Sequence, residues 1–97
     1  MTDDEVRRAL QEVIDPELGV NIVDLGLVRR IGLDEGDVRI TMVMTSPACP
    51  LRDYLQDLVE STVTSIVAGA QSVTVEIVDE PPWTPDMMSE AARRQLA

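Results

Sequence analysis

Apolar and polar positions alternate along the chain with two different periods, which predict helices and strands in turn. Val6, Leu10 and Val13 recur every three or four residues, which is the period of one helix face. The proline at position 16 disfavours a helical backbone in the residue before it. We therefore expect a helix over residues 3–14 and a structured loop over residues 15–26.

Three later segments have the two-residue period of a strand. Segments 27–33 and 38–44 flank a turn sequence, Asp-Glu-Gly-Asp, at residues 34–37, which is typical of a hairpin. Segment 72–79 alternates through apolar valine and isoleucine. We expect three strands, each with one face directed towards the core.

A longer helical pattern separates the second of these strands from the third. It runs over residues 50–68, and Gly69 ends it. A further helix is expected over residues 85–95, because a threonine cap precedes a proline at the first helical position. The apolar set of the long helix consists of Leu51, Leu55, Leu58, Thr62, Ile66 and Ala70.

The order of these elements, αββαβα, predicts the class of fold. A helix that connects the second strand to the third makes those two strands parallel, whereas the hairpin strands are antiparallel. We therefore expect a two-layer α+β domain of a small mixed sheet with helices on one face. The 97 residues suit one core, so we expect a single domain over residues 1–97.

The charge balance argues against two classes of partner. Eight arginines, no lysine and eighteen acidic residues give a net charge of -10, which repels nucleic-acid phosphates and anionic lipids. We expect neither nucleic acid nor a membrane as a partner. The acidic start of the chain lacks the basic region of a signal peptide, and the lone cysteine suits a reducing compartment, so we expect a cytoplasmic protein.

Cys49 is the only cysteine and the best candidate for chemistry. It stands where the alternating pattern of the second strand stops and the long helical pattern starts. A thiol at the first turn of a helix meets unpaired backbone N–H groups, which lower the thiol pKa and favour the reactive thiolate. The alternative interpretation is a small buried apolar residue. The chain has no histidine, which excludes Cys-His and Ser-His-Asp catalysis within one chain.

Two groups of polar residues offer partners for this thiol. Asp15, Glu17 and Asp24 either form turns or approach Cys49 as a proton acceptor or an oxygen ligand. Thr45 and Ser46 either cap the long helix or donate hydrogen bonds to a sulfur or a substrate anion. Trp83 either shields a site or fastens the C-terminal segment to the core.

Four short motifs occur in order along nearly the whole chain. They are Asp-Pro-Glu at 15–17, Asn-Ile-Val-Asp-Leu-Gly-Leu-Val at 21–28, Met-Thr-Ser-Pro-Ala-Cys-Pro at 44–50 and Glu-Pro-Pro-Trp-Thr at 80–84. Together they resemble the SufT/PaaD-type family of iron–sulfur cluster assembly proteins. PaaD-type members typically carry further C-terminal cysteines, and this sequence has none, so it resembles the SufT-like members more closely.

The resemblance implies a fold, a function and a set of site residues. It implies an α+β domain of the iron–sulfur cluster assembly type, often dimeric, that helps to install clusters into client proteins. It also implies that Cys49 is the functional thiol and that Asp15, Glu17, Thr45 and Ser46 line a pocket around it.

The number of thiols limits what the protein can hold. A cluster usually needs four thiolate ligands, whereas one chain supplies one and a homodimer supplies two. We expect a homodimer whose cofactor is a transient iron–sulfur cluster, or iron, held at Cys49 and shared between subunits and outside thiols. The leading hypothesis is a non-enzymatic accessory factor whose partners are the assembly machinery and apo client proteins.

Two alternatives stay open. The first is a thiol enzyme for hydrolysis or acyl transfer, with Cys49 as nucleophile, Asp15 or Glu17 as base, and helix N–H groups as an anion hole. The second is an adaptor that recruits clients through a surface around Trp83 while Cys49 is structural.

Overall fold

The computed structural model of the protein describes residues 1–45 and 51–96. In these ranges the order of helices and strands is the predicted αββαβα, with one additional short 3-10 helix, η1. The elements are α1 (Asp3–Leu10), β1 (Val28–Asp34), β2 (Asp37–Met42), α2 (Arg52–Ile66), β3 (Ser72–Ile77), η1 (Pro85–Met87) and α3 (Glu90–Leu96).

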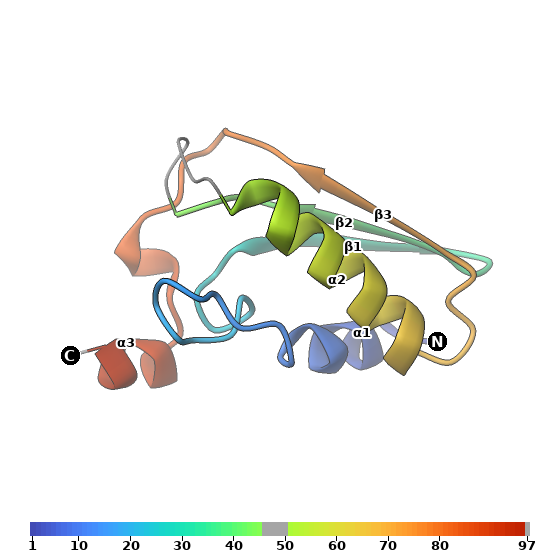
Figure 1. The fold of residues 1–97 in the computed structure, drawn as a ribbon, viewed down its shortest axis with the longest axis horizontal. Coiled ribbons are helices and arrows are strands. Elements are labelled where there is room, and N and C mark those ends of the chain that lie inside the picture. The colour runs from blue at the N-terminus through green and yellow to red at the C-terminus, as the bar shows by residue number, and fades with distance from the viewer. Residues whose placement is uncertain (46–50, 97) are drawn as a thin grey trace.

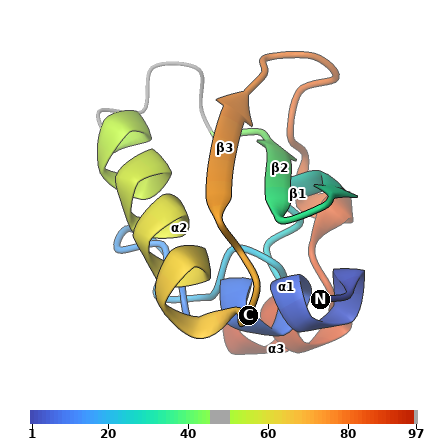
Figure 2. The same ribbon diagram turned by 90° about the vertical axis from the view of Figure 1, so that its right-hand side faces the viewer.

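The three strands form one mixed sheet in the order β1-β2-β3. β1 and β2 are antiparallel, whereas β2 and β3 are parallel, as the helical connection between them requires. The helices lie on one face of this sheet (Figures 1 and 2). The prediction of a two-layer α+β fold is therefore confirmed, and the alternating residues Val38, Ile40 and Met42 of β2 are buried between the layers.

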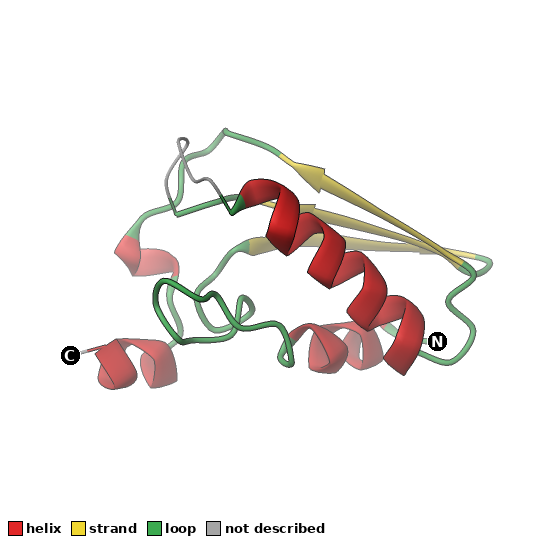
Figure 3. Cartoon of the chain, viewed as in Figure 1, coloured by secondary structure: helices red, strands yellow, loops and turns green. Residues whose placement is uncertain are grey.

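The β1–β2 hairpin closes through the turn that the sequence predicts. Asp34 pairs with Asp37, and the two residues between them, Glu35 and Gly36, have φ values of 47° and 98°. Two positive φ values in a two-residue loop match the right-handed twist of the strands. Much of the rest of the chain is loop, which covers the end of the molecule opposite this hairpin (Figure 3).

The first helix is shorter than the prediction of residues 3–14. α1 ends at Leu10. The N–H groups of the next three residues donate to carbonyls three residues back, as in the tighter turn of a 3-10 helix. Ile14 then forms an antiparallel bridge with Asn21, and the N–H of Ile22 donates to Val13. Val13 is buried as its periodicity suggested, but it lies after the end of α1.

The core face of the long helix is rotated from the predicted one, and the two faces share Leu55. Its buried residues are Leu55, Val59 and Val63, four residues apart, whereas Ile66 of the predicted set is 54% exposed. Apolar residues occupy two adjacent stripes of this helix, so its periodicity alone does not decide between them. Packing against both β3 and α1 selects the valine stripe.

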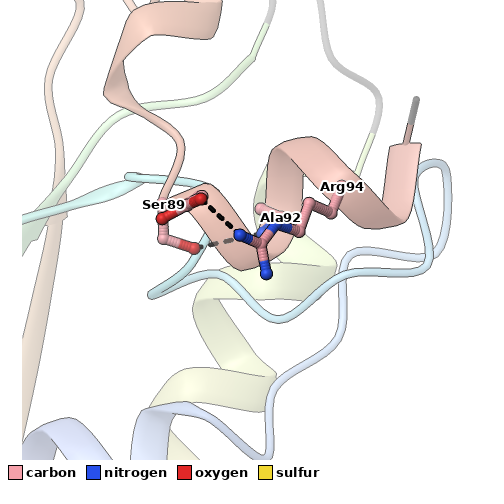
Figure 4. A network of polar contacts seen from close by, with 4 residues as sticks. Ser89, Ala92 and Arg94 are labelled. Carbon is pink, nitrogen blue, oxygen red and sulfur yellow. Dashed lines mark hydrogen bonds and ion pairs between the residues drawn. The ribbon is translucent and has the colours of Figure 1, made fainter.

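The predicted helix over residues 85–95 is divided into η1 and α3. Ser89 separates them, because its N–H donates to the carbonyl of Asp24 at 2.7 Å. Its Oγ then accepts the N–H of Ala92 at 3.2 Å and caps α3 (Figure 4). A bond to a distant loop therefore breaks a helix that local sequence would continue.

Candidate functional site

The candidate site lies at the end of the molecule opposite the hairpin. The C-terminal ends of β2 and β3, the start of α2 and the loop of residues 15–26 all gather there (Figure 1). Cys49 and Ser46 lie outside the described residues, in the connection whose described ends are Thr45 and Leu51. The chain thus carries its only thiol between the C-terminal end of a parallel strand and a helix N-terminus, where α/β sheets commonly bind ligands.

Arg52 fixes the start of α2 to the end of β3. Its guanidinium donates to the carbonyl of Ile77 at 3.0 Å and lies 3.8 Å from a carboxylate oxygen of Asp79. Leu51 occupies the N-cap position and makes no side-chain cap bond. The helix terminus therefore places partial positive charge at the end of the thiol-bearing connection, whereas the guanidinium of Arg52 is paired with Asp79.

Thr45 lines a small cavity and lies six residues before the N-cap of α2. The cavity has a volume of about 50 Å³ and is lined by Val43, Met44, Thr45, Val78, Asp79, Pro82 and Trp83. Pockets for small molecules usually measure about 300–1,000 Å³. This cavity therefore admits a few waters and no substrate of ordinary size.

Asp15 has the turn-forming role that was one of its two interpretations. Its side chain is 2% exposed, and Oδ1 accepts the N–H groups of Glu17 at 2.8 Å and Leu18 at 3.2 Å. Its backbone carbonyl accepts the N–H of Gly19 at 2.7 Å. The buried carboxylate thus holds the turn together and sets the position of Glu17, whose side chain is exposed.

Asp24 is occupied in a second turn of the same loop. Its Oδ2 accepts the side-chain amide of Asn21 at 2.7 Å, and its N–H donates back to Asn21 Oδ1 at 2.9 Å. Its backbone carbonyl is the acceptor for Ser89. The turn interpretation of Asp24 is therefore the one that its contacts favour.

The C-terminal segment docks on this loop and on the start of β1, as one of the two interpretations of Trp83 expected. Trp83 donates from Nε1 to the carbonyl of Leu25 at 2.6 Å, and Arg29 donates to the carbonyl of Pro81 at 2.8 Å. Gly26, at a φ of 79°, lies against the backbone of Met87 so closely that a Cβ would overlap it. Trp83 is thus a fastening residue, and the segment forms one wall of the candidate site.

The described residues contain no group of three or more cysteine, aspartate or glutamate side chains placed to hold a metal ion. In the same residues, no helix is long and apolar enough to cross a membrane.

Comparisons with known proteins agree on one family. The family described as "Iron-sulfur cluster assembly protein" matches residues 3–77. The chain is 46% identical to the Fe-S protein maturation auxiliary factor SufT of Staphylococcus aureus, over 87% of this chain and 96% of that protein. It is 43% identical to the Fe-S protein maturation auxiliary factor YitW of Bacillus subtilis, over 96% of this chain and 91% of that protein. A crystal structure of the domain of unknown function DUF59 from Bacillus anthracis matches with a TM-score of 0.94 at 37% identity, over 97% of this chain and 90% of that one.

Proposed function

This chain belongs to the iron–sulfur cluster assembly protein family, and we propose that it is an accessory factor that helps install clusters in client proteins through Cys49. Its similarity to maturation auxiliary factors, which extends over most of the chain, is the observation that carries the proposal. The same proposal places the protein in the cytoplasm, with the assembly machinery and apo client proteins as its partners.

The position of Cys49 supports a role as a thiolate. The residue precedes Arg52, the first residue of α2, by three positions in the sequence. The N-terminus of a 15-residue helix favours a negative charge nearby. A thiolate is the form that attacks electrophiles and ligates iron.

The cargo is a transient iron–sulfur cluster or iron, not a permanent cofactor. One chain supplies one of the four thiolates that a cluster usually needs. The remaining ligands come from the protein that delivers the cluster or from the client that receives it. Incomplete ligation by the accessory factor makes release favourable once a client offers a full set.

The other expected site residues have supporting roles in this proposal. Asp15 shapes the turn that carries Glu17, and Thr45 lines the wall formed with Trp83. Ser46 is a candidate donor to the cargo, on the same sequence argument as before. In this proposal the protein has no catalytic turnover of its own, in keeping with the maturation auxiliary factors to which it is similar.

Anaerobic reconstitution tests the proposal directly. Wild type, Cys49→Ala and the double variant Cys49→Ala/Ser65→Cys are treated with iron and sulfide, and then mixed with an apo-ferredoxin. Ser65 is exposed on α2, so the double variant keeps one thiol per chain but moves it away from the connection. We expect a chromophore and cluster transfer from wild type alone.

Other outcomes identify the alternatives. Equal transfer by the double variant would show that the position of the thiol is irrelevant. Retention of client binding and client maturation by Cys49→Ala would favour the adaptor, and thioester turnover that Cys49→Ser abolishes would favour the thiol enzyme.

A further inference from the structure

The two edges of the sheet are protected unequally. Directly after β3, Val78 donates its N–H to Met42 of β2, so the carbonyls of Val75 and Ile77 point away from β2. Both carbonyls accept hydrogen bonds from side chains of α2. Gln56 donates to Val75 at 3.1 Å, and Arg52 donates to Ile77 at 3.0 Å. The edge of β3 is therefore covered against pairing with another strand.

The edge of β1 is covered only at its start. There Arg29 donates to the carbonyl of Pro81 at 2.8 Å and to Sδ of Met87 at 3.1 Å, which holds the C-terminal segment across the strand. Further along, the hairpin register directs the backbone groups of Ile31 and Leu33 away from β2. Within the described ranges no backbone group pairs with them, and Leu33 is 37% exposed.

Gly32 lies between these two residues, and no contact or backbone angle within one chain requires a glycine there. Its φ is not in the left-handed region, and an added Cβ would meet only ordinary contacts, with Arg39 Cβ at 3.7 Å. Glycine weakens a strand interior, and where it persists it often marks the close approach of another backbone. The same strand carries opposite charges on either side of it, at Arg30 and Asp34.

We propose that residues 30–34 of β1 pair antiparallel with the same residues of a second copy, about a two-fold axis at Gly32. In this register Ile31 exchanges backbone hydrogen bonds with Leu33 of the second copy, and the two Gly32 residues face each other. Arg30 then lies directly opposite Asp34 of the second copy, and symmetry repeats the ion pair. The exposed Leu33 packs beside Ile31 of the second copy on the helical face of the joined sheet.

Charge selects this register over its neighbours. An axis at Ile31 would place Arg30 opposite Gly32, and an axis at Leu33 would place Asp34 opposite Gly32, so neither pairs opposite charges. A shift by one residue would put backbone groups that already bond to β2 at the interface. Among these registers, only the axis at Gly32 both pairs the free backbone groups of β1 and places opposite charges face to face.

The dimer has a consequence for cluster handling, which rests on the proposed function. Met42, near the start of the thiol-bearing connection, pairs with Val28, four residues from the axis. Because the two β1 strands run in opposite directions, the two Val28–Met42 pairs lie ~26 Å apart along the joined sheet. The second copy therefore adds a second independent site, and each Cys49 meets its own client.

Sedimentation equilibrium with charge swaps tests the interface. We expect a wild-type dimer, a dissociation constant raised at least tenfold in Arg30→Asp and in Asp34→Arg, and recovery in the double swap Arg30→Asp/Asp34→Arg. Arg39→Asp is the matched control, since it reverses an exposed arginine on the neighbouring strand and should leave the dimer intact. A monomer at all concentrations, or a dimer indifferent to both single swaps, would overturn the proposal.

Cross-linking gives a second readout that does not depend on the charge variants folding well. In a Cys49→Ser background, Gly32→Cys should form a disulfide between copies, because facing residues in a non-hydrogen-bonded pair have Cα atoms about 4.5 Å apart. Thr74→Cys on the outward face of β3 should not. Both tests read association alone, so their failure would leave the role of Cys49 in cluster transfer untouched.

Discussion

The two ends of the sheet are built by different kinds of interaction. The turn at the hairpin end is closed by neighbours in sequence, because four consecutive residues join β1 to β2, and the Gly36 carbonyl adds bonds from the N–H groups of Gln71 and Ser72. The site end is made by segments far apart in sequence, joined by single contacts such as Trp83 to Leu25 and Ser89 to Asp24. Local structure thus fixes the scaffold, whereas the functional end depends on a few long-range bonds that single substitutions can break.

The largest expected effect is at Gly26, the closest backbone approach at the site end. Gly26→Ala adds a Cβ that would overlap the carbonyl of Met87, at a φ of 79° that alanine adopts with strain. We expect a loss of about 3 kcal/mol or more in the free energy of unfolding, measured in urea.

Gly19→Ala is the matched control for this substitution. Gly19 has a similar φ of 71° in the same loop, but no atom lies within 4 Å of an added Cβ. It should lose only the backbone strain, about 1 kcal/mol. Equal losses in the two variants would show that the contact with Met87 contributes nothing to stability.

A smaller loss is expected from the buried carboxylate of Asp15. Asp15→Ala leaves the N–H groups of Glu17 and Leu18 without their acceptor, which should cost about 2 kcal/mol in urea unfolding. Asp15→Asn keeps an oxygen acceptor and should recover most of that loss. If Asp15→Asn matches wild type in stability yet abolishes cluster transfer, Asp15 has a direct role at the thiol beyond shaping the turn.

The sequence predicts the hairpin and the mixed sheet because their signals are local. The turn residues at 34–37 and the alternation of apolar residues in β2 and β3 depend on neighbours alone. The end of α1 and the break at Ser89 were missed because each is decided by a bond to a segment elsewhere, Asn21 in one case and Asp24 in the other. The same limit applies to the site, whose wall at Trp83 depends on a long-range bond.

The hairpin end should tolerate damage without affecting the site. Gly36→Ala forces alanine to a φ of 98° and adds a Cβ 3.1 Å from the Gln71 side chain. That side chain is exposed and can shift. We expect a loss of about 1.5 kcal/mol in urea unfolding and an unchanged Trp83 emission spectrum in the folded state.

Glu35→Gly is the control at the neighbouring turn position. Glu35 has a φ of 47°, so glycine relieves backbone strain there while adding freedom to the unfolded chain, and stability should change little. A shift of Trp83 emission in the folded Gly36→Ala protein would contradict the independence of the two ends.

The smallest effect that still separates the ends is the removal of one hydrogen bond. Trp83→Phe keeps an aromatic ring but loses the Nε1–H that donates to Leu25, so we expect a loss of about 1 kcal/mol, followed by far-UV circular dichroism in urea. Tyr54→Phe is the control, because Tyr54 is 52% exposed on α2 and its change should be close to zero. If the bond matters mainly for the site, cluster transfer should slow in Trp83→Phe while Tyr54→Phe transfers like wild type. Unfolding and transfer values equal to wild type for Trp83→Phe would mean that ring packing alone holds the C-terminal segment in place, and that the site end is less dependent on single bonds than the comparison implies.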